Sequence, residues 1–275
     1  MIKDILAIVD NAERATPFVE AVLTFARSNG AHVAIAALTS GPYLAPEFLP
    51  VGVAYVPDEI LSKDDARKVE AVRALVALAD CPVTVFGLHD DIGWLAGDLV
   101  RSRHIADLIL IGAPGHWQTP WLRRRVIETS ILSSGTPTML APSEPRLTAV
   151  RRAVLGWKPS PEANRAVHDL VRFCEPGAHI DVVMAVDRER ERERAGRDGE
   201  EVRRHLMRHG LDTELHILPT DGMSEADVVH GFAMRSRADL LAVGGFGHSR
   251  VREIVLGGVT RSLIADASVP VMLSH

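Results

Sequence analysis

The sequence predicts an α/β protein made of two doubly wound, five-stranded parallel-sheet domains in tandem. The 275 residues are 47% hydrophobic and 24% charged, which is the composition of globular domains with full cores. Short runs of Val, Ile and Leu alternate with segments of helical length, as in parallel sheets covered by helices on both faces. The second half of the chain also repeats the first, so the same fold is expected twice.

The repeat is clearest near the end of each half. Residues 104–115 read HIADLILIGAPG and residues 236–247 read SRADLLAVGGFG. This alignment brings Asp107 onto Asp239, and it brings the glycines that follow into the same positions. Both segments are therefore expected to be a buried strand that ends in a glycine-containing turn.

Near the start of each half the offset between the copies is larger, and it brings Asp10 onto Lys158. The first half must therefore contain an insertion. Segment 40–59 is rich in Pro and Gly and has no helical or strand period, so we expect it to be a long inserted loop.

A linker is expected between the two copies. Segment 141–149, APSEPRLTA, contains two prolines and no periodic pattern, so the domains are placed at 1–144 and 148–275. The expected strands are residues 5–9, 32–38, 82–86, 107–111 and 137–141 in the first domain, and 152–156, 179–186, 213–218, 239–243 and 269–273 in the second.

Charge and composition argue against several classes of protein. A net charge of −5 does not suit a general nucleic-acid surface, which needs a basic excess. Two cysteines, Cys81 and Cys174, are too few and too far apart for a disulfide framework or a zinc site. No apolar run approaches the roughly 20 residues of a membrane span, and the N-terminus lacks the pattern of a signal peptide. We therefore expect a cytoplasmic protein with no nucleic-acid or membrane partner.

Two glycine clusters follow the fourth expected strand of the second half, within GGFGHSRVREIVLGGVTRSL (244–263). The first cluster stands where the strand ends, where glycine lets the backbone turn sharply and approach a ligand closely. After nine further residues the second cluster opens a helix, whose free N–H groups and dipole favour an anion. We therefore expect a ligand beyond the carboxyl ends of the strands. The residues of this expected site are Gly244, Gly247, Gly257, Gly258, Val259 and Thr260.

This pattern of GGFG, nine residues, GG and VT resembles the G-x-x-G, nine residues, G-[ST] signature of ATP-binding universal stress proteins. The segments ADLLAVG and SVPVMLS are also typical of that family. Gly258 departs from the family's Ser or Thr, which removes one hydroxyl and keeps the backbone N–H. The resemblance covers essentially the whole chain in two copies, as in tandem members of the family.

The resemblance implies Rossmann-like domains that hold the ribose and phosphates of ATP, or of a related adenine nucleotide, with these glycines and the following helix. It implies a stress-response or signalling role. It also implies that the two halves pack through their fifth strands as a pseudo-dimer within one chain, and it allows a homodimer of the whole chain.

Further site residues of the second half follow from the resemblance. The family has an aspartate after the first strand, at the metal and phosphate end, and here Lys158 takes that position after Trp157. The family's adenine contact at the end of the second strand falls on Val186. Its spacing from Lys158 equals that between Asp10 and Leu38 in the first half. Because a lysine can contact phosphate directly and repels a divalent cation, we expect ATP binding that depends little on magnesium.

The first half departs further from the signature. Nine residues after Gly115 the chain reads Arg125-Val126, where glycine would be needed for close backbone approach. The first half therefore either binds a different ligand through Arg123–Arg125 or is a degenerate structural copy. We favour the structural copy, because a fold does not guarantee a function.

A histidine follows the second glycine in both copies, His116 in the first and His248 in the second. No carboxylate is implied beside either ring. We therefore expect phosphate contact or surface placement for both histidines, and not catalysis.

Three classes of function are considered. The first is a nucleotide-binding stress or signalling module, and the second is an adenylate-forming or nucleotidyl-transfer enzyme. The sequence has no S-G-G-x-D-S loop, no H-I-G-H motif, and no paired acid and base that would support an enzyme. The third is a structural or lipid-binding tandem protein without nucleotide. We favour the first, with any ATP hydrolysis slow and incidental, and assign no catalytic residue and no metal ligand.

Overall fold

The structure is a computed structural model that describes residues 2–40, 58–90, 105–188, 191–245 and 267–275. In the first half the elements are β1 (Asp4–Val9), α1 (Ala12–Asn29), β2 (His32–Ser40), α2 (Asp58–Leu75), β3 (Val83–Asp90), β4 (Leu108–Ile111), the 3₁₀ helix η2 (Pro114–His116), α4 (Pro120–Ser133) and β5 (Thr138–Leu140). In the second half they are β6 (Val150–Gly156), α5 (Pro161–Phe173), β7 (Cys174–Val186), α6 (Arg192–Arg208), β8 (Asp212–Pro219), α7 (Glu225–Arg235), β9 (Leu240–Gly244) and β10 (Val271–Ser274).

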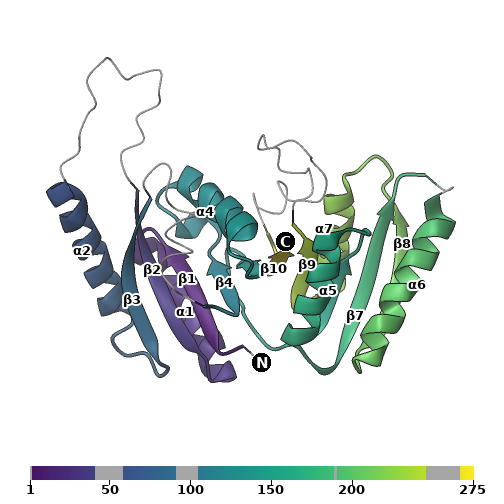
Figure 1. Cartoon of the computed structure of the whole chain (residues 1–275), viewed down its shortest axis with the longest axis horizontal. Coiled ribbons are helices and arrows are strands. Elements are labelled where there is room, and N and C mark those ends of the chain that lie inside the picture. The colour runs from purple at the N-terminus through teal and green to yellow at the C-terminus, as the bar shows by residue number, and fades with distance from the viewer. Residues whose placement is uncertain (1, 41–57, 91–104, 189–190, 246–266) are drawn as a thin grey trace, which may run out of the picture.

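Within the described residues these strands form one ten-stranded sheet in the order β3-β2-β1-β4-β5-β10-β9-β6-β7-β8. Every neighbouring pair is parallel except β5 and β10, which are antiparallel. Figure 1 shows the two halves side by side, the first in purple to teal and the second in green to yellow, with the C-terminus between them. Each half is a doubly wound parallel sheet, so the predicted fold class is confirmed.

Each strand expected from the sequence overlaps an observed strand, and segment 141–149 contains neither helix nor strand. The inserted segment 40–59 lies outside the described residues, apart from its ends. Apolar runs predicted these strands well because parallel strands buried on both faces need apolar side chains at nearly every position.

Local sequence explains where several helices begin and end. The Asn11 side chain accepts a hydrogen bond from Arg14 N at 2.9 Å at the start of α1. Ser160 accepts one from Ala163 N at 3.1 Å at the start of α5. The first of these helices ends at Gly30, whose left-handed conformation (φ 57°, ψ 45°) suits glycine.

Helices cover both faces of the sheet and divide the core into two layers. On one face, α1, α5 and α6 contribute side chains such as Phe18, Leu170 and Leu206. On the other face, α4 and α7 contribute side chains such as Ile127 and Val229. Both layers contain residues of the two halves, so the buried apolar surface is continuous across the chain.

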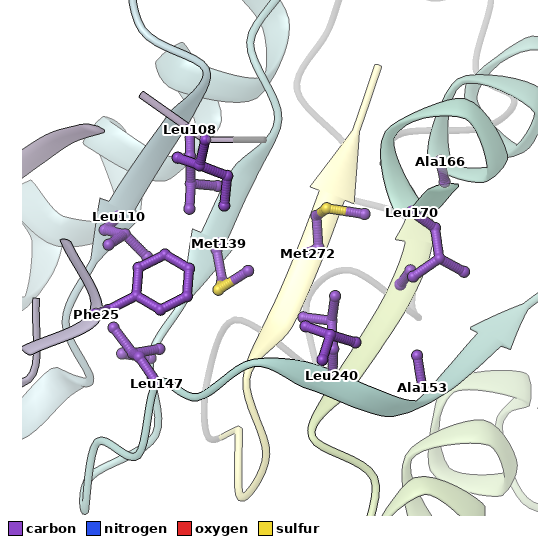
Figure 2. Close-up of a cluster of buried hydrophobic side chains, with 14 of the residues drawn as sticks. Phe25, Leu108, Leu110, Met139, Leu147, Ala153, Ala166, Leu170, Leu240 and Met272 are labelled. Carbon is purple, nitrogen blue, oxygen red and sulfur yellow. The ribbon is translucent and has the colours of Figure 1, made fainter. Parts of the chain in front are cut away.

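The two halves join through their fifth strands, as predicted. The antiparallel register of β5 and β10 places Met272 opposite Met139. In Figure 2 the Met139 side chain lies beside Leu110 of the first half, and the Met272 side chain lies above Leu240 of the second. Pairing the two edges leaves neither strand with an open row of backbone hydrogen-bonding groups.

The repeat extends to single hydrogen bonds. One carboxylate oxygen of Asp107 accepts from the backbone N–H groups of Lys3 and Asp4, at 2.8 and 3.2 Å. Asp239 accepts from the N–H groups of Arg151 and Arg152, both at 2.9 Å. In each half the aspartate before the fourth strand thus fixes the start of the first strand.

Among the described helices, none has both the length and the apolar character needed to cross a membrane.

Candidate functional site

The expected site of the second half lies where the strand order reverses, at the carboxyl ends of β6 and β9. The register joins Gly156, which ends β6, to Val243 of β9. Trp157 and Lys158 directly follow Gly156, and Gly244 directly follows Val243. The structure therefore brings three predicted site residues to one edge of the sheet.

Most of the predicted glycine loop cannot be placed in this geometry. Residues 246–266 lie outside the described part of the chain, while the strands on either side of them, β9 and β10, are parallel neighbours. The predicted site residues in this segment are Gly247, His248, Gly257, Gly258, Val259 and Thr260.

Gly244 has a packing role that the sequence did not reveal. A Cβ atom at this position would lie 2.7 Å from the backbone nitrogen of Ala163 and 2.8 Å from the carbonyl carbon of Glu162. The end of β9 therefore touches the first turn of α5 with backbone against backbone. Only glycine allows this approach, which fixes the helix against the edge that holds the site.

Lys158 is engaged by a carboxylate that the sequence did not suggest. Its ammonium nitrogen lies 2.8 and 3.2 Å from the two carboxylate oxygens of Glu225, the first residue of α7. The lysine side chain is 66% exposed, so the pair is a surface salt bridge. Such pairs contribute roughly 0–1 kcal/mol, and a better partner can displace the carboxylate.

Trp157 packs on the face of the sheet that carries α5 and α6. Its side chain is buried in the same apolar cluster as Val186, which ends β7. The indole nitrogen has no hydrogen-bond partner within the described residues. The ring lines a cavity of about 540 Å³ together with Ser160, His168 and His205. Trp157 therefore has a core position beside a groove between the two helices.

In the first half, side chains of the protein occupy the equivalent place at the carboxyl ends of the strands. Asp10 follows β1 at the position of Lys158, and it is only 2% exposed. Its two carboxylate oxygens accept hydrogen bonds from the backbone N–H groups of Gln118, at 3.0 Å, and Thr119, at 2.8 Å. A carboxylate at a helix N-terminus satisfies free N–H groups and is favoured by the helix dipole. Asp10 thus takes the place of an anion at the start of α4.

Side chains close the rest of this edge. Trp117 is buried, and its carbonyl oxygen accepts a hydrogen bond from Arg14 at 3.3 Å. The Asn11 amide donates to the side-chain oxygen of Gln118 at 3.2 Å. Arg123, which the sequence offered as a ligand for another anion, is buried and donates to the carbonyl of Gly112 at 2.7 Å. These contacts favour the interpretation of the first half as a structural copy.

His116 is in the core, so the expectation of phosphate contact or surface placement is wrong for this residue. Its ring stacks on Phe18 of α1, with centroids 6.1 Å apart, and its Nδ1 accepts from Ala113 N at 3.2 Å. The 3₁₀ turn of η2 directs the ring inward. Burial lowers the pKa of His116, and the nearby Arg123 guanidinium lowers it further, against the opposite effect of a hydrogen bond with the Ser143 backbone.

Comparison with known proteins agrees with this geometry. Residues 149–275 match the model of the Universal stress protein family. The second half of the chain is a universal stress protein domain. No curated protein sequence matches the chain.

Solved structures extend the likeness to the whole chain. A universal stress protein from Archaeoglobus fulgidus DSM 4304 is 15% identical and has a TM-score of 0.69, and the match covers 98% of this chain and 95% of that one. A functionally unknown protein from Pseudomonas aeruginosa PAO1 is 11% identical with a TM-score of 0.55, and the match covers 99% and 92% of the two chains. At these identities the structures show a shared fold. The chain therefore has the tandem arrangement of two universal stress protein folds.

Proposed function

We propose that this universal stress protein binds one adenine nucleotide, such as ATP, in its second half and acts as a nucleotide-responsive stress or signalling module. The observation that carries the proposal is the contrast between two equivalent positions. In the first half Asp10 fills the helix N-terminus with a carboxylate. In the second half that carboxylate is replaced by Lys158, and the chain supplies Gly257 and Gly258 where the first half has Arg125 and Val126.

The proposed site combines described and undescribed residues. Lys158 and Gly244 mark the phosphate end at the edge of β6 and β9, and Val186 at the end of β7 marks the adenine end. The glycine loop supplies the backbone N–H groups for the phosphates. The loop residues in the proposal are Gly247, His248, Gly257, Gly258, Val259 and Thr260, and Trp157 supports the edge from the core side.

The proposal includes little dependence on magnesium. To reach a phosphate, Lys158 must leave Glu225, and an exposed salt bridge of this kind costs roughly 1 kcal/mol or less to break. A charge-assisted hydrogen bond to phosphate contributes roughly 1.5–3 kcal/mol, so the exchange is favourable. The lysine also repels a divalent cation at the position where the family has an aspartate.

We assign the protein no catalytic residue, and any ATP hydrolysis is incidental. The family resemblance implies that single-domain members dimerise through their fifth strands. In this chain the equivalent strands, β5 and β10, already pair with each other. A homodimer of the whole chain would therefore need another surface.

Native mass spectrometry of the purified protein tests the proposal. We expect one copurifying adenine nucleotide per chain, or one ATP bound after incubation with ATP. In the Gly257→Val variant the branched side chain occupies the space of the phosphates. This variant should therefore be detected as the folded chain with no nucleotide bound. A variant that binds ATP as tightly as wild type would place the nucleotide elsewhere.

A further inference from the structure

A polar cluster lies on β7 and β8, away from the carboxyl-terminal edge described above. Its centre is Asp181, a carboxylate that is only 1% exposed. Asp181 Oδ1 lies 2.8 Å from Nε2 of His216 and 3.2 Å from Nε2 of His179, and Oδ2 accepts from Arg152 at 2.9 Å. Alternate residues of neighbouring strands share one face of a sheet, so these side chains meet on the face that carries α7.

The cluster offers the ligand set of a metal ion. One ligand atom each of His179, Asp181 and Glu214 lie within 4.8 Å of one another. His216 Nε2 adds a fourth donor, 3.9 Å from Glu214 Oε2. Two imidazole nitrogens and two carboxylate oxygens suit tetrahedral Zn²⁺, whose ligands lie about 2.0–2.2 Å from the ion. The observed separations need only small side-chain movements to reach that geometry.

The surroundings of the cluster orient two of these groups. Asp212 Oδ2 lies 2.7 Å from Nδ1 of His179, which is the carboxylate–histidine contact that commonly fixes metal-binding imidazoles. When Nδ1 donates to Asp212, the lone pair of Nε2 faces Asp181 Oδ1, so a proton or a cation must lie between the two atoms. Arg152 holds only Oδ2 of Asp181 and leaves Oδ1 directed at the imidazoles.

The charges of the site balance with a divalent ion. Three carboxylates, Asp181, Asp212 and Glu214, carry three negative charges, and Arg152 offsets one of them. A divalent cation bound by neutral imidazoles offsets the other two. This balance reduces the cost of holding a buried carboxylate on the sheet.

The first half shows that the fold does not require these groups. In the strand register, Asp4 of β1 lies opposite His32 of β2, and Arg152 of β6 lies opposite His179 of β7 in the same way. Two residues further along each strand, the same register places Ala34 at the position of Asp181.

By the same register, Phe86 stands at the position of His216 and Thr84 at that of Glu214. Among the described residues of the first half, these three positions of the sheet face therefore carry no ionisable side chain. Of the four groups the first half keeps one, because His32 stands at the position of His179. A buried carboxylate and the imidazole beside it are costly unless they are paired, so the presence of Asp181 and His216 in one copy alone indicates a task of that copy.

We propose that His179, Asp181, Glu214 and His216 form a binding site for a divalent transition-metal ion of the zinc class. The site is separate from the proposed nucleotide site, because it lies on other residues and on the β7–β8 side of the sheet. Asp212 and Arg152 are positioning residues that hold His179 and Asp181.

Titration of the chelator-treated full chain with ZnCl₂, in competition with a chromophoric chelator, tests the proposal. Wild type should bind one Zn²⁺ per chain. Asp181→Ala and His216→Phe install the residues that the first half uses, and each should weaken binding by more than about tenfold. Glu214→Gln should also weaken it, and because this side chain is 63% exposed the variant leaves the core unchanged.

His32→Ala is the matched control, because His32 holds the position of His179 in the first half. This variant should bind Zn²⁺ as wild type does. Absence of saturable Zn²⁺ binding by wild type would overturn the proposal. Binding that persists unchanged in both His216→Phe and Glu214→Gln would overturn it as well, since the ion would then sit on other histidines.

Discussion

The carboxylate of Asp10 accepts a 2.8 Å hydrogen bond from the backbone N–H of Thr119, the residue that caps α4. In the first half, the residue that directly follows β1 thereby occupies the place at the N-terminus of α4 where an anion would bind. The second half has Lys158 at the equivalent position, with its side chain at the surface. We propose a single nucleotide site in the chain on the basis of this difference between two copies of one fold.

Loss of the Asp10 carboxylate should destabilise the first half. Asp10→Ala leaves the part-buried N–H groups of Gln118 and Thr119 without their acceptor, and the loss of a side chain that caps a helix N-terminus costs about 0.5–2 kcal/mol. Denaturant-induced unfolding should show a fall of that size in the free energy of unfolding. Lys158→Ala at the equivalent position is the control, and an exposed change of this kind should stay within about 0.5 kcal/mol. Equal effects of the two substitutions would argue against a structural role for the aspartate alone.

Gly244→Ala should destabilise the second half through overpacking. The added Cβ would lie 2.7 Å from Ala163 N, a backbone atom that cannot move without shifting α5. A cost of about 1–3 kcal/mol is typical of overpacking, and thermal unfolding would register it as a lower Tm. Gly115→Ala is the matched control, since a Cβ there meets nothing within 4 Å. A Gly244→Ala variant with the Tm of wild type would show that α5 is free to move away from β9.

His116 should make stability depend on pH. The pKa of the buried ring is lowered, so the unfolded chain takes up the proton first as the pH falls. The stabilisation is complete above the unfolded pKa of about 6.5 and is lost as the pH falls through that value toward the lower folded pKa. The destabilisation caused by His116→Gln should therefore be smaller at pH 5.5 than at pH 7.5, as measured by denaturant unfolding. If His116→Gln lowered the free energy of unfolding by the same amount at both pH values, the fold would not be keeping the ring neutral.

Lys158 and Glu225 should have opposite effects on ATP affinity. Lys158→Ala removes a charge-assisted contact and should weaken binding by about ten- to hundredfold. Glu225→Gln frees the lysine from its partner and should strengthen binding by a few fold, since the salt bridge contributes roughly 1 kcal/mol or less. Calorimetry with magnesium and with a chelator separates direct contact from a metal bridge. A large loss of affinity on chelation, with Lys158→Ala unchanged, would show that a cation still mediates phosphate binding.

The fold could be predicted from the sequence because its determinants are local. Strands such as β4 are continuous apolar runs, and the aligned aspartates Asp107 and Asp239 make equivalent hydrogen bonds in the two halves. The positions of Trp157, Lys158 and Gly244 at one edge also followed from strand order.

The rest of the site depends on contacts between distant segments. The Lys158–Glu225 pair depends on where α7 begins, and the burial of His116 depends on a 3₁₀ turn that folds beneath α1. The cluster around Asp181 depends on the register of three strands, which no spacing along the chain displays. Periodicity and motif spacing report local structure and carry no information about such long-range partners.

The stoichiometry of ATP binding, measured by isothermal titration calorimetry on the full chain, tests the central claim most directly. We expect a value near one for wild type and for Asp10→Asn, and no binding for Gly257→Val, because the proposed site lies in the second half. A stoichiometry near two would contradict it, since the first half would then bind nucleotide despite the Asp10 carboxylate. Binding that survives in Gly257→Val would contradict it equally, because the nucleotide would not depend on the glycine loop.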